Sequence, residues 1–197
     1  MSIEAQLPFS QACENNKEVI LDKLRVHFSD VTGVLEIGSG TGQHAVHFAT
    51  HMPHLLWFPT DRAVQLATLN KRLGVIDVAN IQSAIAFSIG ENEWPSVPVD
   101  GVFSANTAHI MQPNEVECMM GLIAENLPEN GVFCQYGPFT QGGEFISESN
   151  KAFHHHLLAQ GYGGYRDISE LKRWASGLTL SAHYTMPANN ELLIWVK

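Results

Sequence analysis

Positive charge is scarce in this chain of 197 residues, which has 11 Lys and Arg against 20 Asp and Glu and a net charge of −9 at pH 7. Proteins that bind a phosphate backbone need a basic surface, and no cluster of Lys or Arg stands out in the sequence. No apolar run approaches the roughly 20 residues that a membrane-spanning helix needs. We therefore expect neither a nucleic-acid partner nor a membrane partner.

Cysteine is scarce as well. Cys13, Cys118 and Cys134 are far apart and odd in number, which supports neither a disulfide framework nor a zinc-binding spacing. The first residues lack the charged and then apolar pattern of a secretory signal. These absences together predict a cytoplasmic protein.

Histidine is common, with ten residues, and so invites a metal hypothesis. His44, His47 and His51 have a spacing that brings side chains to one side of a helix. However, no acid joins them, and Phe48 indicates that the neighbouring stripe faces a core. The run at 154–156 would point three ways from a helix. We therefore expect no metal site.

Turn-rich and apolar segments alternate with helical patterns along the chain, which is typical of β-α-β units and a parallel sheet. The expected strands cover residues 34–37, 55–60, 81–89, 100–105, 132–136, 178–184 and 192–196. The expected helices cover residues 15–28, 43–50, 64–73, 114–126, 149–160 and 169–175. The length fits one α/β domain over residues 1–197 with a sizeable core.

The most informative segment runs from Val34 to His44, where an apolar strand ends in an acid and a glycine-rich turn. A dinucleotide-binding turn needs G-x-G-x-x-G, and Gln43 stands where the third glycine would be. The glycines instead follow G-x-G-x-G, with Glu36 two residues ahead of them. An acid beside the turn would repel a pyrophosphate and suit a ligand with positive charge. The plain alternative is a turn that only packs a strand against a helix.

This segment resembles motif I of the class I methyltransferases that use S-adenosylmethionine (SAM), whose pattern is acid-x-G-x-G-x-G. The resemblance implies SAM as the cofactor, held by Glu36, Gly38, Ser39, Gly40 and Gly42. It also implies a Rossmann-like sandwich with helices on both faces of a seven-stranded, mostly parallel sheet. In that fold the last strand runs antiparallel between strands five and six.

Three further positions are cofactor candidates at the ends of expected strands. Asp61 can accept both ribose hydroxyls, and its alternative role is to cap the next helix. Arg62 can lie along the adenine or be an ordinary surface charge. Phe87 can pack on the adenine ring or belong to the core, and the acid that such enzymes often carry in that region is missing.

Two segments that follow later strands are candidates for the reacting end of the cofactor and for catalysis. Asn106 could contact the methionine end of SAM. His109 could take a proton from a hydroxyl or amine acceptor, because its ordinary pKa is near neutrality, or could be a histidine satisfied at a helix start. Tyr136 is a second catalytic candidate. Alignment of the acceptor alone can supply roughly 7–11 kcal/mol, so a base is not required.

The chain as a whole resembles a narrower group, the DUF938 family, also called UPF0585 or methyltransferase-like protein 26. The stretches that carry this resemblance span residues 14 to 197, and they are 14–17, 35–47, 57–62, 106–110, 136–138, 149–150, 166–167 and 186–190. Asn15, Asn16, Tyr136, Asn150 and Asn189 become candidates for an acceptor pocket. For each of the asparagines, a cap or turn role is the alternative, and Asn15 with Glu18 has the spacing of a capping box. An N-terminal helical segment, at about residues 1–30, is expected to cover the cofactor and acceptor side.

The sequence thus predicts a SAM-dependent methyltransferase with a small-molecule acceptor. Two other hypotheses remain open at this point. One is a SAM-binding regulatory or assembly module without transferase activity, and the other is an NAD-dependent oxidoreductase. The sequence leaves the oligomeric state and the acceptor open.

Overall fold

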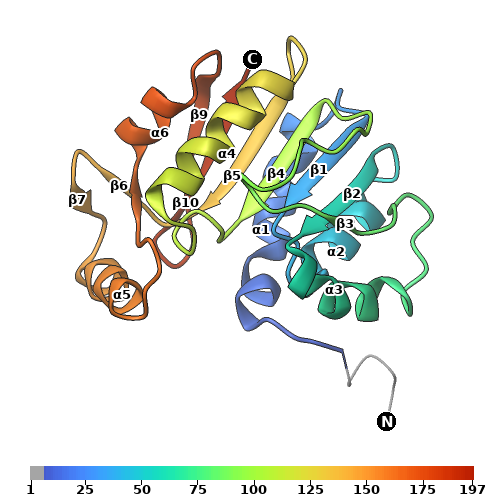
Figure 1. The fold of residues 1–197 in the computed structure, drawn as a ribbon, viewed down its shortest axis with the longest axis horizontal. Helices are drawn as coiled ribbons and strands as arrows, with labels where there is room; N and C mark the ends of the chain where they lie inside the picture. The colour runs from blue at the N-terminus through green and yellow to red at the C-terminus, as the bar shows by residue number, and fades with distance from the viewer. Residues whose placement is uncertain (1–6) are drawn as a thin grey trace. The chain divides into compact units, whose positions relative to one another are not determined.

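The computed structural model describes residues 7–197, and the chain divides into two compact units between Phe103 and Ser104. The first unit contains α1 (Gln11–His27), β1 (Gly33–Ile37), α2 (Gln43–His51), β2 (Leu56–Asp61), the short helix η2 (Ala63–Gln65), α3 (Leu66–Leu73), β3 (Ile85–Ala86) and the start of β4 (Gly101–Ala105). The second unit contains α4 (Pro113–Asn126), β5 (Val132–Gly137), β6 (Phe139–Gln141), β7 (Glu144–Phe145), α5 (Glu148–Ala159), β8 (Arg166–Asp167), α6 (Ile168–Trp174), β9 (Thr179–Met186) and β10 (Asn190–Val196). Figure 1 labels these elements except η2 and β8.

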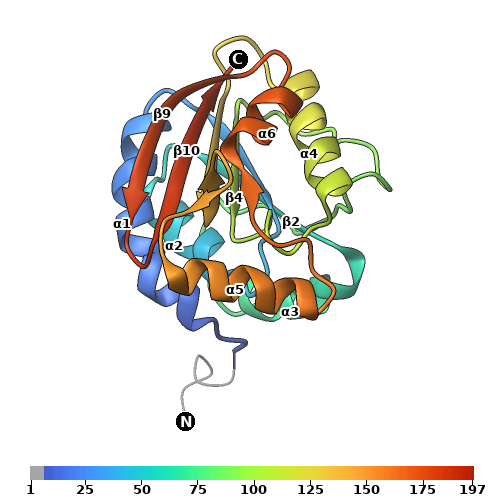
Figure 2. The same cartoon turned by 90° about the vertical axis from the view of Figure 1, so that its left-hand side faces the viewer.

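The main sheet has seven strands in the order β3-β2-β1-β4-β5-β10-β9. β1 pairs with β2, and β2 with β3, in parallel, whereas β10 pairs antiparallel with both β5 and β9. The predicted mostly parallel sheet, with an antiparallel last strand next to strand five, is therefore confirmed. Figure 2 shows the β9–β10 hairpin that ends the chain.

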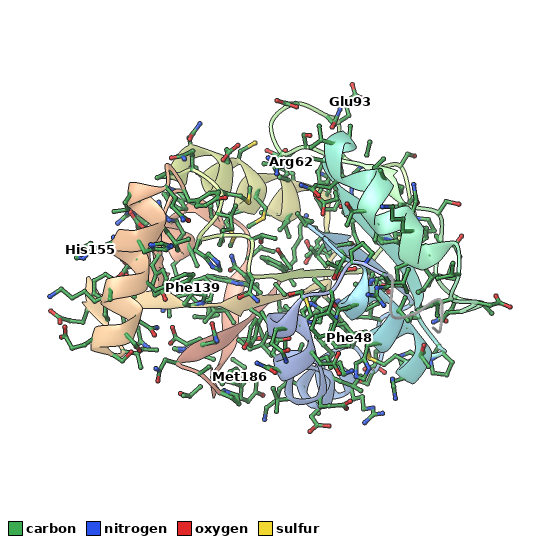
Figure 3. The ribbon with its side chains drawn as sticks, turned by 90° about the horizontal axis from the view of Figure 1, so that it is seen from below. Phe48, Arg62, Glu93, Phe139, His155 and Met186 are labelled. Carbon is green, nitrogen blue, oxygen red and sulfur yellow. The ribbon has the colours of Figure 1, made fainter. Side chains whose placement is uncertain are left out.

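The first helix begins earlier than its periodicity predicts. α1 starts at Gln11 because the side chain of Ser10 caps it by accepting a hydrogen bond from the Cys13 amide at 3.4 Å. The predicted start and capping box at Asn15 are therefore wrong, and Asn15 lies inside the helix. The core of this unit contains Phe48, Trp57 and Phe103, whose ring centroids lie 5.2–6.0 Å apart. Phe48 is labelled in Figure 3.

The predicted strand over residues 81–89 is mostly wrong. Only Ile85 and Ala86 pair with β2, and Ile81 makes a single bridge to Trp57. The side chain of Asn80 donates to the carbonyl groups of Ala49, Met52 and Leu55, and so fixes the chain as a loop just before this segment. An apolar run thus lies beside the sheet without forming a full ladder.

In the second unit, the helices start at strong caps. α4 has a capping box of Gln112 and Glu115 with Pro113 in its first turn, and α6 has one of Asp167 and Glu170. A small sheet of β7, β6 and β8 was not predicted from the sequence, because strands of two or three residues leave no periodic pattern. Figure 1 labels β6 and β7. None of the helices in the described part of the chain is long and apolar enough to cross a membrane.

Candidate functional site

The turn between β1 and α2 explains all three glycines of the motif. Gly38, Gly40 and Gly42 have φ values of 79°, 55° and 75°, in the left-handed region that favours glycine. A Cβ at Gly42 would lie 3.0 Å from Leu69 Cδ1, whereas one at Gly40 would meet nothing within 4 Å. Gly42 therefore packs the turn against α3, while the backbone of Gly40 is open to the approach of a ligand.

Asp61 ties this turn to the end of β2. Its Oδ2 accepts from the Gly40 amide at 2.7 Å, and its Oδ1 accepts from the Arg62 amide at 2.8 Å. The carboxylate does not cap the following helix, since the N-cap of η2 is Arg62 and no side chain caps that helix. Each oxygen keeps lone-pair capacity for a further donor, so the carboxylate can still receive hydroxyl groups.

Glu36 is buried, with 2% of its surface exposed. Its Oε2 accepts from Ser39 Oγ at 2.8 Å and from Trp57 Nε1 at 3.0 Å. Burial raises the pKa of Glu36 to about 7, although these two hydrogen bonds oppose the shift. A carboxyl group that is partly neutral at pH 7 repels a pyrophosphate less than the sequence argument assumed. The electrostatic case against a dinucleotide is therefore weaker than the case from the glycine spacing.

Arg62 and Phe87 flank Asp61 in different ways. The side chain of Arg62 is exposed (Figure 3). Phe87 is buried against Trp94, with ring centroids 5.8 Å apart, and its amide donates to the Asp61 carbonyl at 2.8 Å. The core role of Phe87 is thus observed.

Residues 8–10 are held to the same turn in part by Gln43, the residue that replaces the third glycine. Gln43 Oε1 accepts from the Ser10 amide at 2.5 Å, and Gln43 Nε2 donates to the Ser10 carbonyl at 3.3 Å. Arg72 donates to the carbonyl groups of Thr41 and Pro8, at 2.7 Å and 2.6 Å. This role of Gln43 and Arg72 was not predicted from the sequence, where the one local signal is a glutamine in place of glycine.

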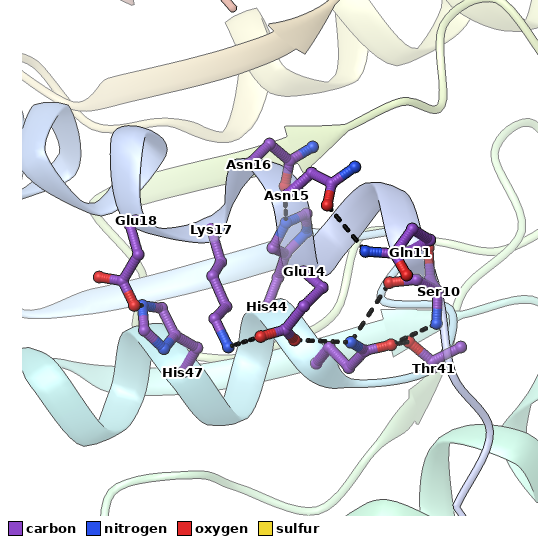
Figure 4. A network of polar contacts seen from close by, with 11 residues as sticks. Ser10, Gln11, Glu14, Asn15, Asn16, Lys17, Glu18, Thr41, His44 and His47 are labelled. Atoms are coloured by element: carbon purple, nitrogen blue, oxygen red, sulfur yellow. Dashed lines mark hydrogen bonds and ion pairs between the residues drawn. The ribbon is translucent and has the colours of Figure 1, made fainter.

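Among the acceptor candidates of the first unit, Asn16 is buried and Asn15 is exposed. Asn16 Oδ1 lies 2.7 Å from His44 Nε2, as Figure 4 shows. Burial lowers the pKa of His44 to about 3, so the ring is neutral and its Nε2–H donates to Asn16. Asn15 Oδ1 accepts from Gln11 Nε2 at 2.8 Å. Asn16 thus fixes α1 to α2, and Asn15 makes a surface contact within α1.

In the second unit, Asn106, His109 and Tyr136 come together at the end of β5. Asn106 has a left-handed φ of 59°, and its amide donates to the Tyr136 carbonyl at 2.9 Å. A Cβ at Gly137 would lie 3.9 Å from His109 Nδ1 and 4.0 Å from the Asn106 amide nitrogen. Burial lowers the pKa of His109 to about 4. The ring is thus neutral at pH 7 and a weaker base than an ordinary histidine.

Asn150 and Asn189 also come together, but their hydrogen bonds have a structural role. Asn150 Nδ2 donates to the Asn189 carbonyl at 2.9 Å, and Asn189 Nδ2 donates to Ser147 Oγ at 3.2 Å. Ser147 caps α5, and Asn189 has a left-handed φ of 56° in the β9–β10 turn. These contacts anchor the hairpin turn to the start of α5, as the cap-and-turn alternative predicts.

A polar cluster around Glu191 was missed from the sequence. Glu191 is 1% exposed, and its Oε1 accepts from both His183 Nε2 at 2.5 Å and Gln141 Nε2 at 2.8 Å. Its Oε2 is buried without a hydrogen-bond partner among the described residues. The only sequence signal is an acid at the start of an otherwise apolar strand. Within residues 7–197, no group of three or more His, Cys, Asp or Glu side chains is placed to hold a metal ion.

A family model described as "Protein of unknown function (DUF938)" matches residues 7–197 of the chain. The chain belongs to the DUF938 family. Solved structures with the same fold include human N-acetylserotonin methyltransferase in complex with SAM, at a TM-score of 0.81 and 13% identity over 95% of the DUF938 chain and 53% of the human one. An O-methyltransferase family protein from Burkholderia thailandensis matches at a TM-score of 0.80 and 13% identity, over 94% and 57% of the two chains.

A putative O-methyltransferase from Nostoc punctiforme matches at a TM-score of 0.78 and 21% identity, over 94% of the DUF938 chain and 56% of its own. The DUF938 chain thus spans a little more than half the length of these neighbours. At these identities the likeness establishes the Rossmann-like class I methyltransferase fold of the DUF938 chain.

Proposed function

We propose that this DUF938 protein binds SAM and transfers its methyl group to a small-molecule acceptor. The observation that carries the proposal is the turn after β1, where Gly40 leaves backbone open to a ligand and is held by the carboxylate of Asp61. A neighbour of the same fold is described in complex with SAM and another with S-adenosylhomocysteine. The net charge of −9 favours a small acceptor over nucleic acid.

The residues of the first unit fit the cofactor in their chemistry. Asp61 can accept ribose hydroxyls with the lone pairs that its two backbone contacts leave free. The backbone of Gly40 is free of side-chain obstruction, and Phe87 lies in the core next to Asp61. Bound SAM would supply a methyl group from its sulfonium. The rest of the cofactor would then leave as a neutral thioether. Arg62 is exposed and would lie along the adenine.

Gln43 argues against the dinucleotide alternative more directly than charge does. In a dinucleotide turn the third glycine allows helix and strand to pack closely. Here Gln43 uses its amide to bind Ser10 through two hydrogen bonds, so the position is committed to holding the N-terminal segment. We accordingly place SAM ahead of NAD. We also place the protein in the cytoplasm, because all three cysteines are free.

Calorimetric titration with SAM and S-adenosylhomocysteine tests the proposal. The Asp61→Ala variant should bind SAM more weakly by roughly 1.5–3 kcal/mol, the net worth of a hydrogen bond to a charged group. Asp30→Ala is the matched control, since Asp30 is an exposed carboxylate on the same unit. Binding of NAD together with no heat from either SAM or S-adenosylhomocysteine would overturn the proposal.

A second candidate is a SAM-binding module that transfers no methyl group. The observation in its favour is His109, because its buried ring is a poor base at neutral pH. Incubation with methyl-labelled SAM and a metabolite extract separates the two candidates. Label in a small molecule supports the transferase, whereas SAM binding with label confined to SAM supports the module.

A further inference from the structure

A pocket of about 640 Å³ lies beside β3, the edge strand of the main sheet. Its wall is formed by the C-terminal end of α3, the loop at residues 74–78 and residues 81–84, which lead into β3 (Figure 1). Small-molecule pockets typically measure about 300–1,000 Å³. Among the described residues, none of those proposed for the cofactor lines this pocket. The first unit thus has a second place that is large enough for a small molecule.

Hydrogen bonds hold both sides of the pocket in place. On one side, Asn80 Nδ2 donates to three carbonyl groups of the first unit, and the Gln82 amide donates to the Trp57 carbonyl at 2.8 Å. On the other side, the Ile76 amide donates to the Arg72 carbonyl at 3.1 Å, which ties the loop to the end of α3. A ligand would therefore bind to a wall that is already ordered, at little cost in loop entropy.

Apolar side chains form much of this wall. Four of them are half-buried, those of Leu73, Ile76, Val78 and Ile81. Val75, which also lines the pocket, is 49% exposed, although large apolar side chains are usually buried. A ligand with an apolar body would remove this surface from water, which favours binding.

The charge on the wall is negative. Asp77 is the one charged residue among the described residues that line the pocket, and it is exposed. Its carboxylate makes no hydrogen bond or ion pair with the described part of the chain. The C-terminal end of α3, which carries the negative end of the helix dipole, also borders the pocket. The two basic residues in the last turn of α3, Lys71 and Arg72, do not line it. These charges favour a cation.

The unpaired polar groups at this place accept hydrogen bonds. An ionised carboxylate such as that of Asp77 only accepts. The last carbonyl of α3, that of Leu73, accepts no hydrogen bond from the described residues. An ammonium group offers three donors and no acceptor, so it matches this set, whereas a quaternary ammonium has no N–H to donate.

We propose that this pocket binds a protonated primary amine with an apolar body, whose ammonium group pairs with Asp77 and whose carbon chain covers Ile76 and Ile81. The inference goes beyond the proposed function and does not depend on it, because the pocket shares no residue with the turn at 38–42 or with Asp61.

Hexylamine is the probe, which is protonated at pH 7 as a lysine side chain is. 1-Hexanol has the same carbon chain without the charge, and hexanoate has the opposite charge. Each is titrated into the full chain labelled with ¹³C at the isoleucine methyl groups and followed by NMR. We expect hexylamine to shift the methyl signals of Ile76 and Ile81, and to leave that of the fully buried Ile20 unchanged.

Hexylamine should bind roughly tenfold more tightly than 1-hexanol, as a hydrogen bond to a charged group implies. Hexanoate should bind more weakly than either. Equal binding of hexylamine and 1-hexanol, tighter binding of hexanoate, or unshifted methyl signals of Ile76 and Ile81 would each overturn the proposal.

Two variants sharpen the test. Asp77→Asn keeps the shape of an exposed side chain, and it should weaken hexylamine binding roughly tenfold while 1-hexanol binds as before. Asp30→Asn, which changes an exposed carboxylate of the same unit outside the pocket, should leave both affinities unchanged. Ser83→Trp places a large ring at an exposed position of the wall and should abolish binding of both compounds. Unaltered hexylamine binding in Asp77→Asn contradicts the inference.

Titration of S-adenosylhomocysteine into the same samples separates this pocket from the proposed cofactor site. Hexylamine should bind with the same affinity in its presence and in its absence. Displacement of hexylamine by S-adenosylhomocysteine would overturn the assignment of a second site. Specific binding of hexylamine to a chain that binds no S-adenosylhomocysteine would support the pocket and count against the proposed function alone.

Discussion

The glycines at 40 and 42 allow one prediction to be worked in detail, because alanine at each would meet the same backbone penalty in different surroundings. Both have left-handed φ values, and an L-residue there costs about 1–2 kcal/mol. At Gly42 the added Cβ also lies 3.0 Å from Leu69 Cδ1 and 3.3 Å from Arg72 Cδ. At Gly40 it meets nothing within 4 Å.

The neighbours of Gly42 cannot easily move away. Leu69 is fully buried, and Arg72 is held by the carbonyl groups of Thr41 and Pro8. Overpacking of this kind typically costs about 1–3 kcal/mol. We therefore expect Gly42→Ala to lower the free energy of unfolding by about 2–5 kcal/mol, and Gly40→Ala by only about 1–2 kcal/mol.

Urea denaturation of both variants and the parent chain measures these free energies of unfolding. Calorimetry with SAM on the same samples should rank the two variants in the opposite order, because SAM is proposed to bind at the open backbone of Gly40. Gly40→Ala should therefore weaken SAM binding by more than its small loss of stability suggests. Equal losses of stability in the two variants would refute the packing argument, and unchanged SAM binding in Gly40→Ala would refute the role given to its open backbone.

Two further predictions concern buried polar groups of the first unit. Burial raises the pKa of Glu36 from 4.5 to about 7, so the folded state binds the proton more tightly than the unfolded state does. The free energy of unfolding should thus fall by about 3 kcal/mol as pH rises from below 4.5 to above 7. In Glu36→Gln, urea titrations should show no such dependence of the free energy of unfolding on pH. An unchanged dependence would count against the assignment of this effect to Glu36. Asn16→Leu leaves the buried His44 N–H without its partner and should cost about 1–3 kcal/mol by thermal or urea unfolding. Asn15→Leu, at the exposed neighbouring position, should change stability by no more than about 0.5 kcal/mol, and similar losses in both would contradict the buried hydrogen bond.

The strands and helices that the sequence predicted well are those whose pattern is local. The apolar runs at β1, β2 and β5 and the glycine at 74 after α3 stand in consecutive residues. The prediction of a strand over residues 81–89 was mostly wrong, because an apolar segment is also found where a chain lies along a sheet edge without pairing. β6, β7 and β8 are too short to show a period.

The residues of the candidate site also differ in how local their sequence signals are. The turn from Gly38 to Gly42 and the acid at Asp61 have local signatures, and the structure joins them through the Gly40 amide. The contact between Gln43 and Ser10 links residues 33 positions apart, and that between Gln141 and Glu191 links residues 50 apart. Such pairs exist only once the strands have found their register, so a single sequence carries no pattern for them.

The hydrogen bonds that join Gln43 and Arg72 to residues 8–10 affect how this protein responds to its surroundings. The same side chains hold residues 8–10 and stabilise the turn at which the ligand would bind. Detachment of the segment and relaxation of the turn are therefore linked equilibria, and linkage acts with equal strength in both directions. A cofactor that stiffens the turn would hold residues 8–10 in place, and a partner that pulled on the exposed ring of Phe9 would weaken cofactor binding by the same factor.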